Sequence, residues 1–322
     1  DTSLYNSRQR ASFIAHGAVL ENMDIAARSH GYSMRPTLFP ASAGGRTSSK
    51  GEQNSLIAAI EFQESPKVND PLLPFITKRV TNRNPYKRKR HIDKEAIAAL
   101  MSIPTGKNIG ELYLEGAREK MRFLAKAVAM HDRILFENEK LHHFVFEHIR
   151  WSEKEASKTK DGMPLKTMGL NSLQTPAFKL LGNWGLVSFL NLFGLSRIIP
   201  FQSYKLCIGS SALGLIQMPG TTPEDFVLGG RLLQKVWLTA TKHGLAFHPM
   251  TGITFLMQRI YIDGEPGFSE THKKLLEKAW GYLRNVFPVD KSKGIIMLFR
   301  IGYASIPSVR APRRAVDDIF DI

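Results

Sequence analysis

The sequence predicts an α+β protein, in which helices and a few buried strands pack around one core. Three observations support this fold class: a long helical pattern between Glu111 and Trp151, two short apolar segments typical of strands, and two similar helices far apart in the chain. The 322 residues are 43% hydrophobic and 10% aromatic, so the chain can bury a sizeable core.

The N-terminal third is predicted to hold a loop, a strand and a helix. The segment ASAGGRTSSKGEQN (41–54) has small residues and glycines without apolar periodicity, which is typical of a loop. SLIAAIEF (55–62) is expected to be a buried strand, and EAIAALMSI (95–103) to be a helix.

The middle of the chain is predicted to form one long helix between Glu111 and Trp151. Its apolar stripe has helical spacing and is made of Met121, Leu124, Ala125 and Val128, continued by Ile134, Leu141 and Val145. EASKTKDGMP (155–164) breaks this pattern. GIIMLFRIGYA (294–304) is apolar on both parities, which predicts a fully buried strand.

Two segments align without gaps: GAVLENMDIAARSHGY (17–32) and GRLLQKVWLTATKHGL (230–245). Both are predicted to be buried helices that end at a glycine, which takes a positive φ at little cost. The matched pairs are Gly17 with Gly230, Leu20 with Leu233, Glu21 with Gln234, Ala27 with Ala240, and His30-Gly31 with His243-Gly244. Either two buried helices coincide by chance, or one α+β unit has been duplicated.

The most apolar run is LLGNWGLVSFLNLFGL (180–195). It is shorter than the roughly 20 residues of a membrane span, contains two asparagines and is followed by Arg197. We expect a core helix or the cover of an active site rather than a membrane contact.

Charge and cysteine content narrow the possible partners. The net charge is +15, which favours anionic ligands. Cys207 is the only cysteine, so an intrachain disulfide and a cysteine metal cluster are excluded, and a small buried thiol in a reducing, cytoplasmic compartment is expected. The chain has no phosphate-binding P-loop, dinucleotide fingerprint or nucleophile elbow. We expect His131, His142, His143 and His148 to form a polar face rather than a metal site.

One basic stretch has the pattern of a phosphate site. In KRVTNRNPYKRKR (78–90), Arg79, Thr81 and Arg83 occupy alternate positions, so in an extended segment their side chains point the same way. Two guanidiniums and a hydroxyl could bind a phosphate. A second cluster, VRAPRRAVDD (309–318), holds Arg310, Arg313 and Arg314. Solvated charge explains both clusters equally well on composition, and KRKR (87–90) is interpreted as a solvated basic turn.

Taken together, these segments resemble the flavin-dependent nitroreductases, and within them the Acg-type branch. RVTNR (79–83) is similar to the family's element that grips FMN phosphate, and 229–245 to its central helix. HPMTG (248–252) is similar to the turn beside the flavin ring, with Thr251 in place of the usual Glu. LFRIGYASIPSVRAPRR (298–314) is similar to the closing strand and arginine-rich tail.

The resemblance implies a nitroreductase-like fold of two tandem copies that imitate a dimer in one chain, so that a monomer suffices. Residues 1–70 would be the first half and 71–322 the second, with a lid-like apolar insertion around 180–215. The branch's loop of the type P-S-x-x-N-x-Q-P-W has no match here. We therefore expect the first copy to be truncated at its N-terminus. Either upstream residues are missing from this sequence, or the protein has lost part of its flavin pocket.

The implied function is an FMN-binding oxidoreductase that takes hydride from NAD(P)H and reduces a small-molecule acceptor such as a nitroaromatic or a quinone. The residues expected to bind FMN are Arg79, Thr81, Arg83, Pro249, Met250, Thr251, Gly252, Arg313 and Arg314. No side chain is singled out as catalytic, and no metal or membrane span is expected. The alternatives are an FMN holder without turnover and a basic nucleic-acid-binding protein, although no nucleic-acid-binding motif is present.

Overall fold

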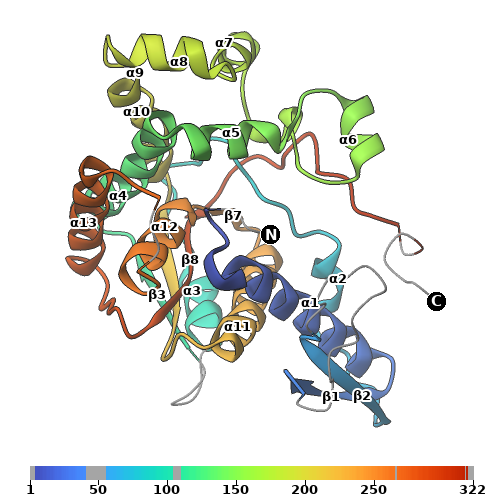
Figure 1. Ribbon diagram of the computed structural model, residues 1–322. Helices are drawn as coiled ribbons and strands as arrows, with labels where there is room; N and C mark the ends of the chain where they lie inside the picture. The colour runs from blue at the N-terminus through green and yellow to red at the C-terminus, as the bar shows by residue number, and fades with distance from the viewer. Residues whose placement is uncertain (1–3, 41–55, 104–109, 265–266, 316, 318–322) are drawn as a thin grey trace.

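A four-stranded antiparallel sheet lies at the centre of the protein. The computed structural model describes residues 4–40, 56–103, 110–264, 267–315 and 317. The sheet has the strand order β3-β6-β8-β7 (Figure 1). Its strands are β3 (Glu111–Glu115), β6 (Ala212–Met218), β8 (Gly294–Gly302) and β7 (Ala246–Pro249).

The two inner strands, β6 and β8, are buried along their whole length, because helices cover both faces of the sheet. Ile295 and Leu298 point into one apolar cluster, whereas Ile296, Phe299 and Ile301 belong to the other. The prediction of a fully buried strand at 294–304 is therefore confirmed for β8. Cys207 is also fully buried, as expected.

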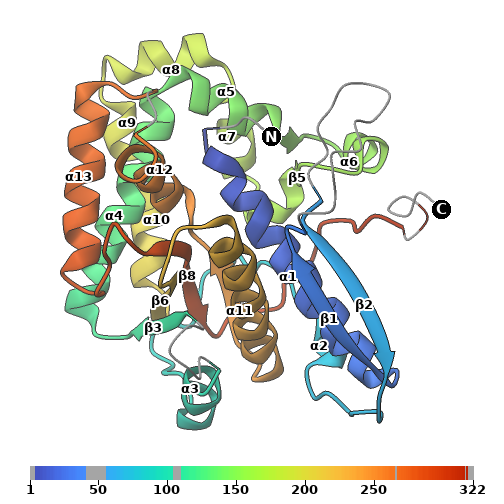
Figure 2. The same cartoon turned by 60° about the horizontal axis from the view of Figure 1, so that its bottom comes forward.

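Different helices cover the two faces of the sheet (Figure 2). The first face packs against α4 (Arg118–Glu137) and α12 (Gly252–Tyr261), and α5 (Glu139–Glu147) and α13 (Glu270–Arg284) pack outside them in the same apolar cluster. The second packs against α3 (Lys94–Met101), α11 (Pro223–Lys242) and the start of α1 (Arg10–Ser29), which follows the short η1 (Ser7–Gln9). The helix predicted at 95–103 is thus confirmed as α3.

The predicted long helix between Glu111 and Trp151 is wrong in its extent. Residues 111–115 form the edge strand β3, and the helical part is divided into α4 and α5 at Asn138. Asn138 has extended backbone angles, and its side chain accepts a hydrogen bond from the Leu141 N–H, so it ends one helix and caps the next. The predicted apolar stripe on α4 is buried as expected.

Helices α1 and α11, the two similar segments, pack against each other at their glycines. A Cβ on Gly17 would overlap the carbonyl oxygen of Val227, and one on Gly230 would overlap that of Ile14. The backbones therefore approach as closely as only glycine allows. Both helices end as predicted, since Gly31 and Gly244 have φ of +88° and +68°.

A two-stranded hairpin extends from the end of α1. It pairs β1 (Tyr32–Leu38) with β2 (Ala58–Glu64) in antiparallel register. The strand predicted at 55–62 therefore exists, but the prediction that it is buried is wrong, because Phe62 is 50% exposed and no residue of β2 is buried. The predicted loop at 41–54 lies outside the described residues.

A group of short elements connects α5 to β6. It consists of β4 (Ile149–Arg150) paired in parallel with β5 (Met163–Pro164), then α6 (Glu153–Thr159), η2 (Leu165–Met168), α7 (Gln174–Leu180), α8 (Trp184–Asn191), α9 (Leu195–Ile198) and α10 (Pro200–Ile208). The interpretation of 180–195 as a core helix is wrong, because Val187 is the only buried residue of α8.

Within the described residues, no single helix is long and apolar enough to cross a membrane. The segments Trp184–Asn191 and Leu195–Ile208 pass the length and composition test only as a pair, and they are bent by 84° relative to each other.

Candidate functional site

The basic segment 79–83 follows the short helix α2 (Leu73–Ile76) and lies beside strand β7 as an additional parallel neighbour. Thr81 forms a parallel bridge with Phe247, and the Asn82 N–H donates to the Phe247 carbonyl at 2.9 Å. On the other side, the buried Asn82 amide donates to the Ser305 carbonyl at 2.8 Å. The segment is therefore held in extended form between β7 and the C-terminal tail.

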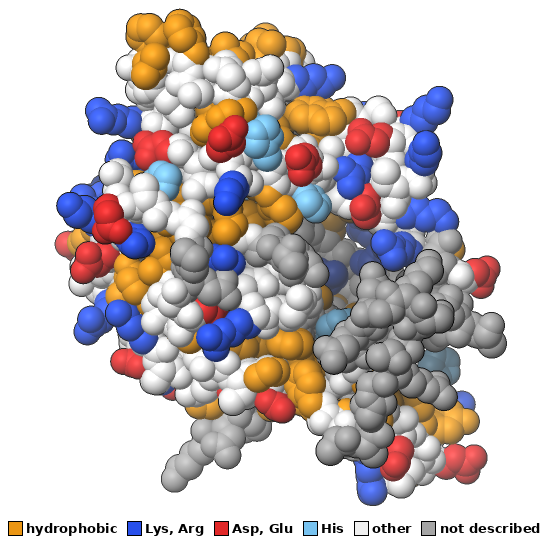
Figure 3. Space-filling model, viewed as in Figure 1, with side chains coloured by type: hydrophobic (Ala, Val, Ile, Leu, Met, Phe, Trp, Pro, Cys, Tyr) orange, Lys and Arg blue, Asp and Glu red, His pale blue; other side chains and the backbone are white. Residues whose placement is uncertain are grey.

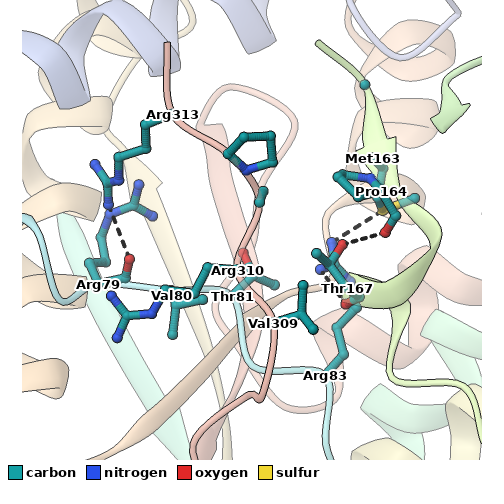
Figure 4. Close-up of a pocket in the computed structure, with 13 residues that line it drawn as sticks. Arg79, Val80, Thr81, Arg83, Met163, Pro164, Thr167, Val309, Arg310 and Arg313 are labelled. Carbon is teal, nitrogen blue, oxygen red and sulfur yellow. Dashed lines mark hydrogen bonds between the residues drawn. The ribbon is translucent and has the colours of Figure 1, made fainter. Parts of the chain in front are cut away.

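A cavity of about 400 Å³ opens along this segment. Figure 4 shows Arg79 and Arg313 on one side of it and Met163, Pro164 and Thr167 on the other. Its lining is Arg79, Val80, Thr81, Arg83, Gly162, Met163, Pro164, Thr167, Val309, Arg310, Ala311, Pro312 and Arg313. The structure thus brings together four of the nine predicted cofactor-binding residues and adds Arg310, with no acidic side chain in the lining.

Arg79 is the most unusual side chain of this cavity. Its guanidinium lies 4.1 Å from the centre of the Trp237 ring, and its buried Nε–H has no hydrogen-bond partner. Burial, and then the charge of Arg313, lowers the pKa of Arg79 to about 10. Arg313 donates to the carbonyls of Ile76 and Arg79, both at 3.3 Å, which brings the two guanidinium-bearing side chains to the same wall.

Arg83 stands on the opposite wall. It donates to the Thr167 carbonyl at 3.2 Å and contacts the sulfur of Met163. Burial, and then the charge of Arg300, lowers the pKa of Arg83. In the described part of the chain, neither Arg79, Arg83 nor Arg313 forms an ion pair with a carboxylate. Arg79 and Arg83 are partly buried and Arg313 is exposed. Three such cations without carboxylate partners make the cavity suited to an anion.

A further arginine, Arg300, lies next to the site, and the sequence reasoning did not single it out. Arg300 of β8 is fully buried; its Nε donates to His248 Nδ1 at 2.9 Å and its Nη2 to the Asn84 carbonyl at 3.1 Å. Its guanidinium also lies 4.1 Å from the centre of the Tyr86 ring. The one sequence signal was a lone arginine inside the apolar run IIMLFRIGY, because a charge in a buried strand needs a specific partner.

The predicted turn 249–252 lies at the end of β7 and outside the lining of the arginine cavity. The Met250 N–H donates to the Leu298 carbonyl, and α12 begins at Gly252. A Cβ on Gly252 would overlap the His131 ring as it now lies, so the α12 N-terminus and His131 pack closely. Pro249, Met250, Thr251 and Gly252 are thus near the arginines along β7 but do not join them in one cavity.

Arg314 is also absent from the cavity lining. It donates to the Lys160 carbonyl at 3.3 Å instead. The side chains of KRKR (87–90) are exposed, which agrees with a solvated basic turn.

His131 of α4, His142 and His143 of α5 and the following His148 do not form one polar face, so this prediction is wrong. His142 is fully buried, with Nε2 within 2.8 Å of the Leu181 carbonyl oxygen, whereas His143 and His148 are exposed. His131 lies 2.8 Å from the Tyr5 hydroxyl and 3.1 Å from Asp132. No group of three or more His, Cys, Asp or Glu side chains is arranged for a metal ion within the described ranges.

No protein-family model matches the chain. A Mycobacterium tuberculosis (strain CDC 1551 / Oshkosh) protein named "Uncharacterized protein MT1398" is 25% identical over 312 residues, which cover 91% of this chain. The match spans only 41% of that curated relative's length.

Several solved structures are similar at low identity. They include the FMN-dependent nitroreductase NfnB from Mycobacterium smegmatis in complex with NADPH (14% identity, TM-score 0.42, covering 77% of this chain and 96% of that one). The nitroreductase-like family protein from Bacillus cereus is 13% identical with a TM-score of 0.39, covering 79% and 97%. A nitroreductase with bound FMN from Bacteroides fragilis NCTC 9343 is 11% identical with a TM-score of 0.39, covering 79% and 99%.

Proposed function

We propose that the arginine cavity binds the phosphate and ribityl chain of FMN, and that the protein is an oxidoreductase of the nitroreductase type. The observation that carries the proposal is the cavity itself: four arginines surround about 400 Å³ with no acidic residue in the lining. A phosphate dianion would neutralise these charges and accept their hydrogen bonds.

The residues present fit such a group. Arg79 keeps a buried Nε–H without an acceptor, and a phosphate oxygen would satisfy it. Arg313 on the same wall and Arg83 on the opposite wall would hold the phosphate from two sides, while the Thr81 hydroxyl would contact phosphate or ribityl oxygens. Asn82 fixes these side chains indirectly, because it anchors their backbone to β7 and to the tail.

The turn 249–252 is proposed to lie beside the flavin ring. The first backbone N–H groups of α12 have no intrahelical acceptor, and they lie at the positive end of the helix. They would steady negative charge on the ring. When bound, FMN supplies the redox chemistry: it accepts hydride from NAD(P)H and passes electrons to a nitroaromatic or quinone-like acceptor. The chain's own part is to bind, orient and polarise, and no side chain is assigned a catalytic role.

The tandem arrangement of two nitroreductase-like halves, 1–70 and 71–322, belongs to the same proposal. It is supported by contacts between α1 and α11 that are reciprocal: the alignment of the two helices pairs the residues of one contact with those of the other. Gly17 approaches Val227, and Gly230 approaches Ile14, the position that matches Val227. Reciprocal contacts of this kind are the mark of a two-fold interface.

A second reciprocal pair supports the same two-fold relation. The Glu21 carboxylate lies 3.4 Å from Lys235 Nζ. At the matching positions, Gln234 Nε2 donates to Asn22 Oδ1 at 2.7 Å. A chance similarity between two helices gives no reason for such symmetry, whereas a duplicated unit that packs like a dimer does.

The test is a titration of the protein with FMN, followed by NADPH without oxygen, read by visible absorbance and flavin fluorescence. We expect FMN to bind and its band to bleach with NADPH. A bound band that persists would favour the alternative, an FMN holder without turnover. If the wild-type protein does not bind FMN, both the oxidoreductase and the FMN holder are contradicted.

Arg79→Ala should weaken FMN binding by about 10- to 100-fold, since a charged hydrogen bond contributes about 1.5–3 kcal/mol. Arg122→Ala is the matched control, because Arg122 is an exposed arginine of α4 outside the cavity. Equal affinities for the two variants would show that the cavity is not the phosphate site.

The predicted lid at 180–215 stays a prediction. None of its residues lines the arginine cavity.

A further inference from the structure

An exposed group of large apolar side chains lies on α8, α9 and the start of α10. We define it as the apolar tip: Phe189 (57% exposed), Leu192 (81%), Phe193 (74%), Ile198 (69%) and Phe201 (56%). Figure 3 shows hydrophobic side chains gathered at the top of the molecule, where Figure 1 labels α8 and α9. Such a concentration is unusual on a protein surface that faces only water.

The apolar tip belongs to a segment whose charges are all positive. Between Asp161 and Glu224 the sequence holds no Asp or Glu, but it contains Lys166, Lys179, Arg197 and Lys205. Lys179, Arg197 and Lys205 are exposed, and none forms an ion pair with a described residue. The Lys205 ammonium lies 4.3 Å from the centre of the Phe201 ring, so its stem follows the apolar surface while its charge stays in water.

We propose that the apolar tip docks on the surface of an anionic lipid membrane. Apolar side chains would enter the boundary between headgroups and acyl chains, and the three free cations would contact lipid phosphates. The charges of this segment are all positive, so they fit an anionic lipid surface better than a second copy of this chain, whose net charge is +15.

The geometry indicates shallow seating rather than a span. Helix α8 has eight residues and is therefore about 12 Å long, against a hydrocarbon core of about 30 Å. The 84° bend between α8 and the following segment also prevents the two from crossing as one rod. Val187 and Ser196 are buried, which fixes α8 and α9 to the body of the protein and leaves the tip facing outward.

Sedimentation of the whole protein with vesicles tests the proposal. The vesicles are phosphatidylcholine alone or a 7:3 mixture with phosphatidylglycerol, in low and high salt. We expect binding to the mixed vesicles, at least tenfold weaker binding to phosphatidylcholine alone, and weakening by salt. Failure to bind either vesicle would overturn the proposal.

Phe193→Glu should weaken vesicle binding at least tenfold. Phe62→Glu is the matched control, because Phe62 is a half-exposed phenylalanine on the β1-β2 hairpin, away from the tip. Both side chains are exposed, so both variants should fold, which circular dichroism checks. Equal loss in the two variants, or no loss in either, would overturn the proposal. So would a dimer that Phe193→Glu dissociates in a protein that ignores vesicles, because the tip would then seat a second copy.

Discussion

Arg300 is fully buried and Arg79 is partly buried with a buried Nε, and the two guanidiniums differ in their hydrogen-bond partners. Arg300 donates to His248 Nδ1 and to backbone carbonyls, and it lies over Tyr86, so its guanidinium has partners within the protein. Arg79 lies over Trp237 with its Nε–H unpaired. A buried donor without an acceptor costs free energy unless a ligand supplies one. Arg300 therefore stabilises the fold, whereas Arg79 keeps one N–H donor that a ligand can use.

The contact with Arg300 also makes His248 sensitive to pH. Burial, and then the charges of Arg300 and Arg83, lowers the pKa of His248 well below its ordinary value. In the unfolded chain His248 takes up a proton near pH 6.5, whereas in the folded protein it stays neutral. Its stabilisation is thus complete above pH 6.5 and is lost as the pH falls below it.

We expect the unfolding free energy of the flavin-free protein to fall between pH 6.5 and 5.5. His248 contributes at most about 1.4 kcal/mol to this loss, because the uptake of one proton over one pH unit changes the free energy by no more than that. His142 and His272 add to the loss, since burial lowers their pKa values too. In urea unfolding at both pH values, His248→Asn, which keeps an acceptor for Arg300, should lose less than the wild type. Parallel losses would contradict this account.

At the scale of elements, the sequence pattern predicted the helices and strands whose burial follows one pattern along their whole length. Strand β8 is apolar on both parities because helices cover both faces, and the stripe of α4 keeps one period throughout. Strand β3 was missed because its five residues join α4 through only Gly116 and Ala117, so two periods merge. The exposure of β2 was missed because it depends on where the hairpin leaves the body of the fold, which local sequence does not encode.

The candidate site was predictable to a similar extent. Alternation in an extended segment placed Arg79, Thr81 and Arg83 on one cavity. Two other features of the site depend on the tertiary fold and were not predictable from local sequence. They are the loop around Met163, which forms the opposite wall, and the backbone carbonyls that accept hydrogen bonds from Arg300. Arg314 follows Arg313 in the sequence but donates to the Lys160 carbonyl outside the cavity lining, because in an irregular tail neighbouring side chains need not face the same way.

The glycine contact between α1 and α11 gives a prediction at this scale. Gly17→Ala removes a glycine from a helix interior, which alone would stabilise the helix by about 1 kcal/mol. The added Cβ overlaps the backbone at Val227, which cannot move aside as a side chain can. We therefore expect net destabilisation of about 1–3 kcal/mol. Gly281→Ala on α13 is the matched control: its Cβ meets nothing within 4 Å, so thermal unfolding should show a small gain. A gain in both variants would contradict the close packing.

At the scale of the whole molecule, the α1–α11 contact decides the assembly that we expect. If two halves of one chain form the two-fold interface, the surface that a second copy would need is already covered. The ion pairs of Arg231 with Glu21 and Asp24 also join α1 and α11 along this contact. A duplicated unit thereby gains the packing of a dimer without its dependence on concentration.

Sedimentation velocity should therefore give one species of about 36 kDa, the mass of one chain, at all micromolar concentrations. Association of two chains through the apolar tip would also give a dimer. Phe193→Glu distinguishes a dimer that forms through the tip from one that forms through another surface. A dimer that dissociates in Phe193→Glu forms through the tip and leaves the tandem arrangement intact. A dimer that persists in Phe193→Glu must use another surface, and the halves of one chain would then not suffice. The second outcome would contradict the tandem proposal even if the reciprocal contacts around Gly17 and Gly230 remain.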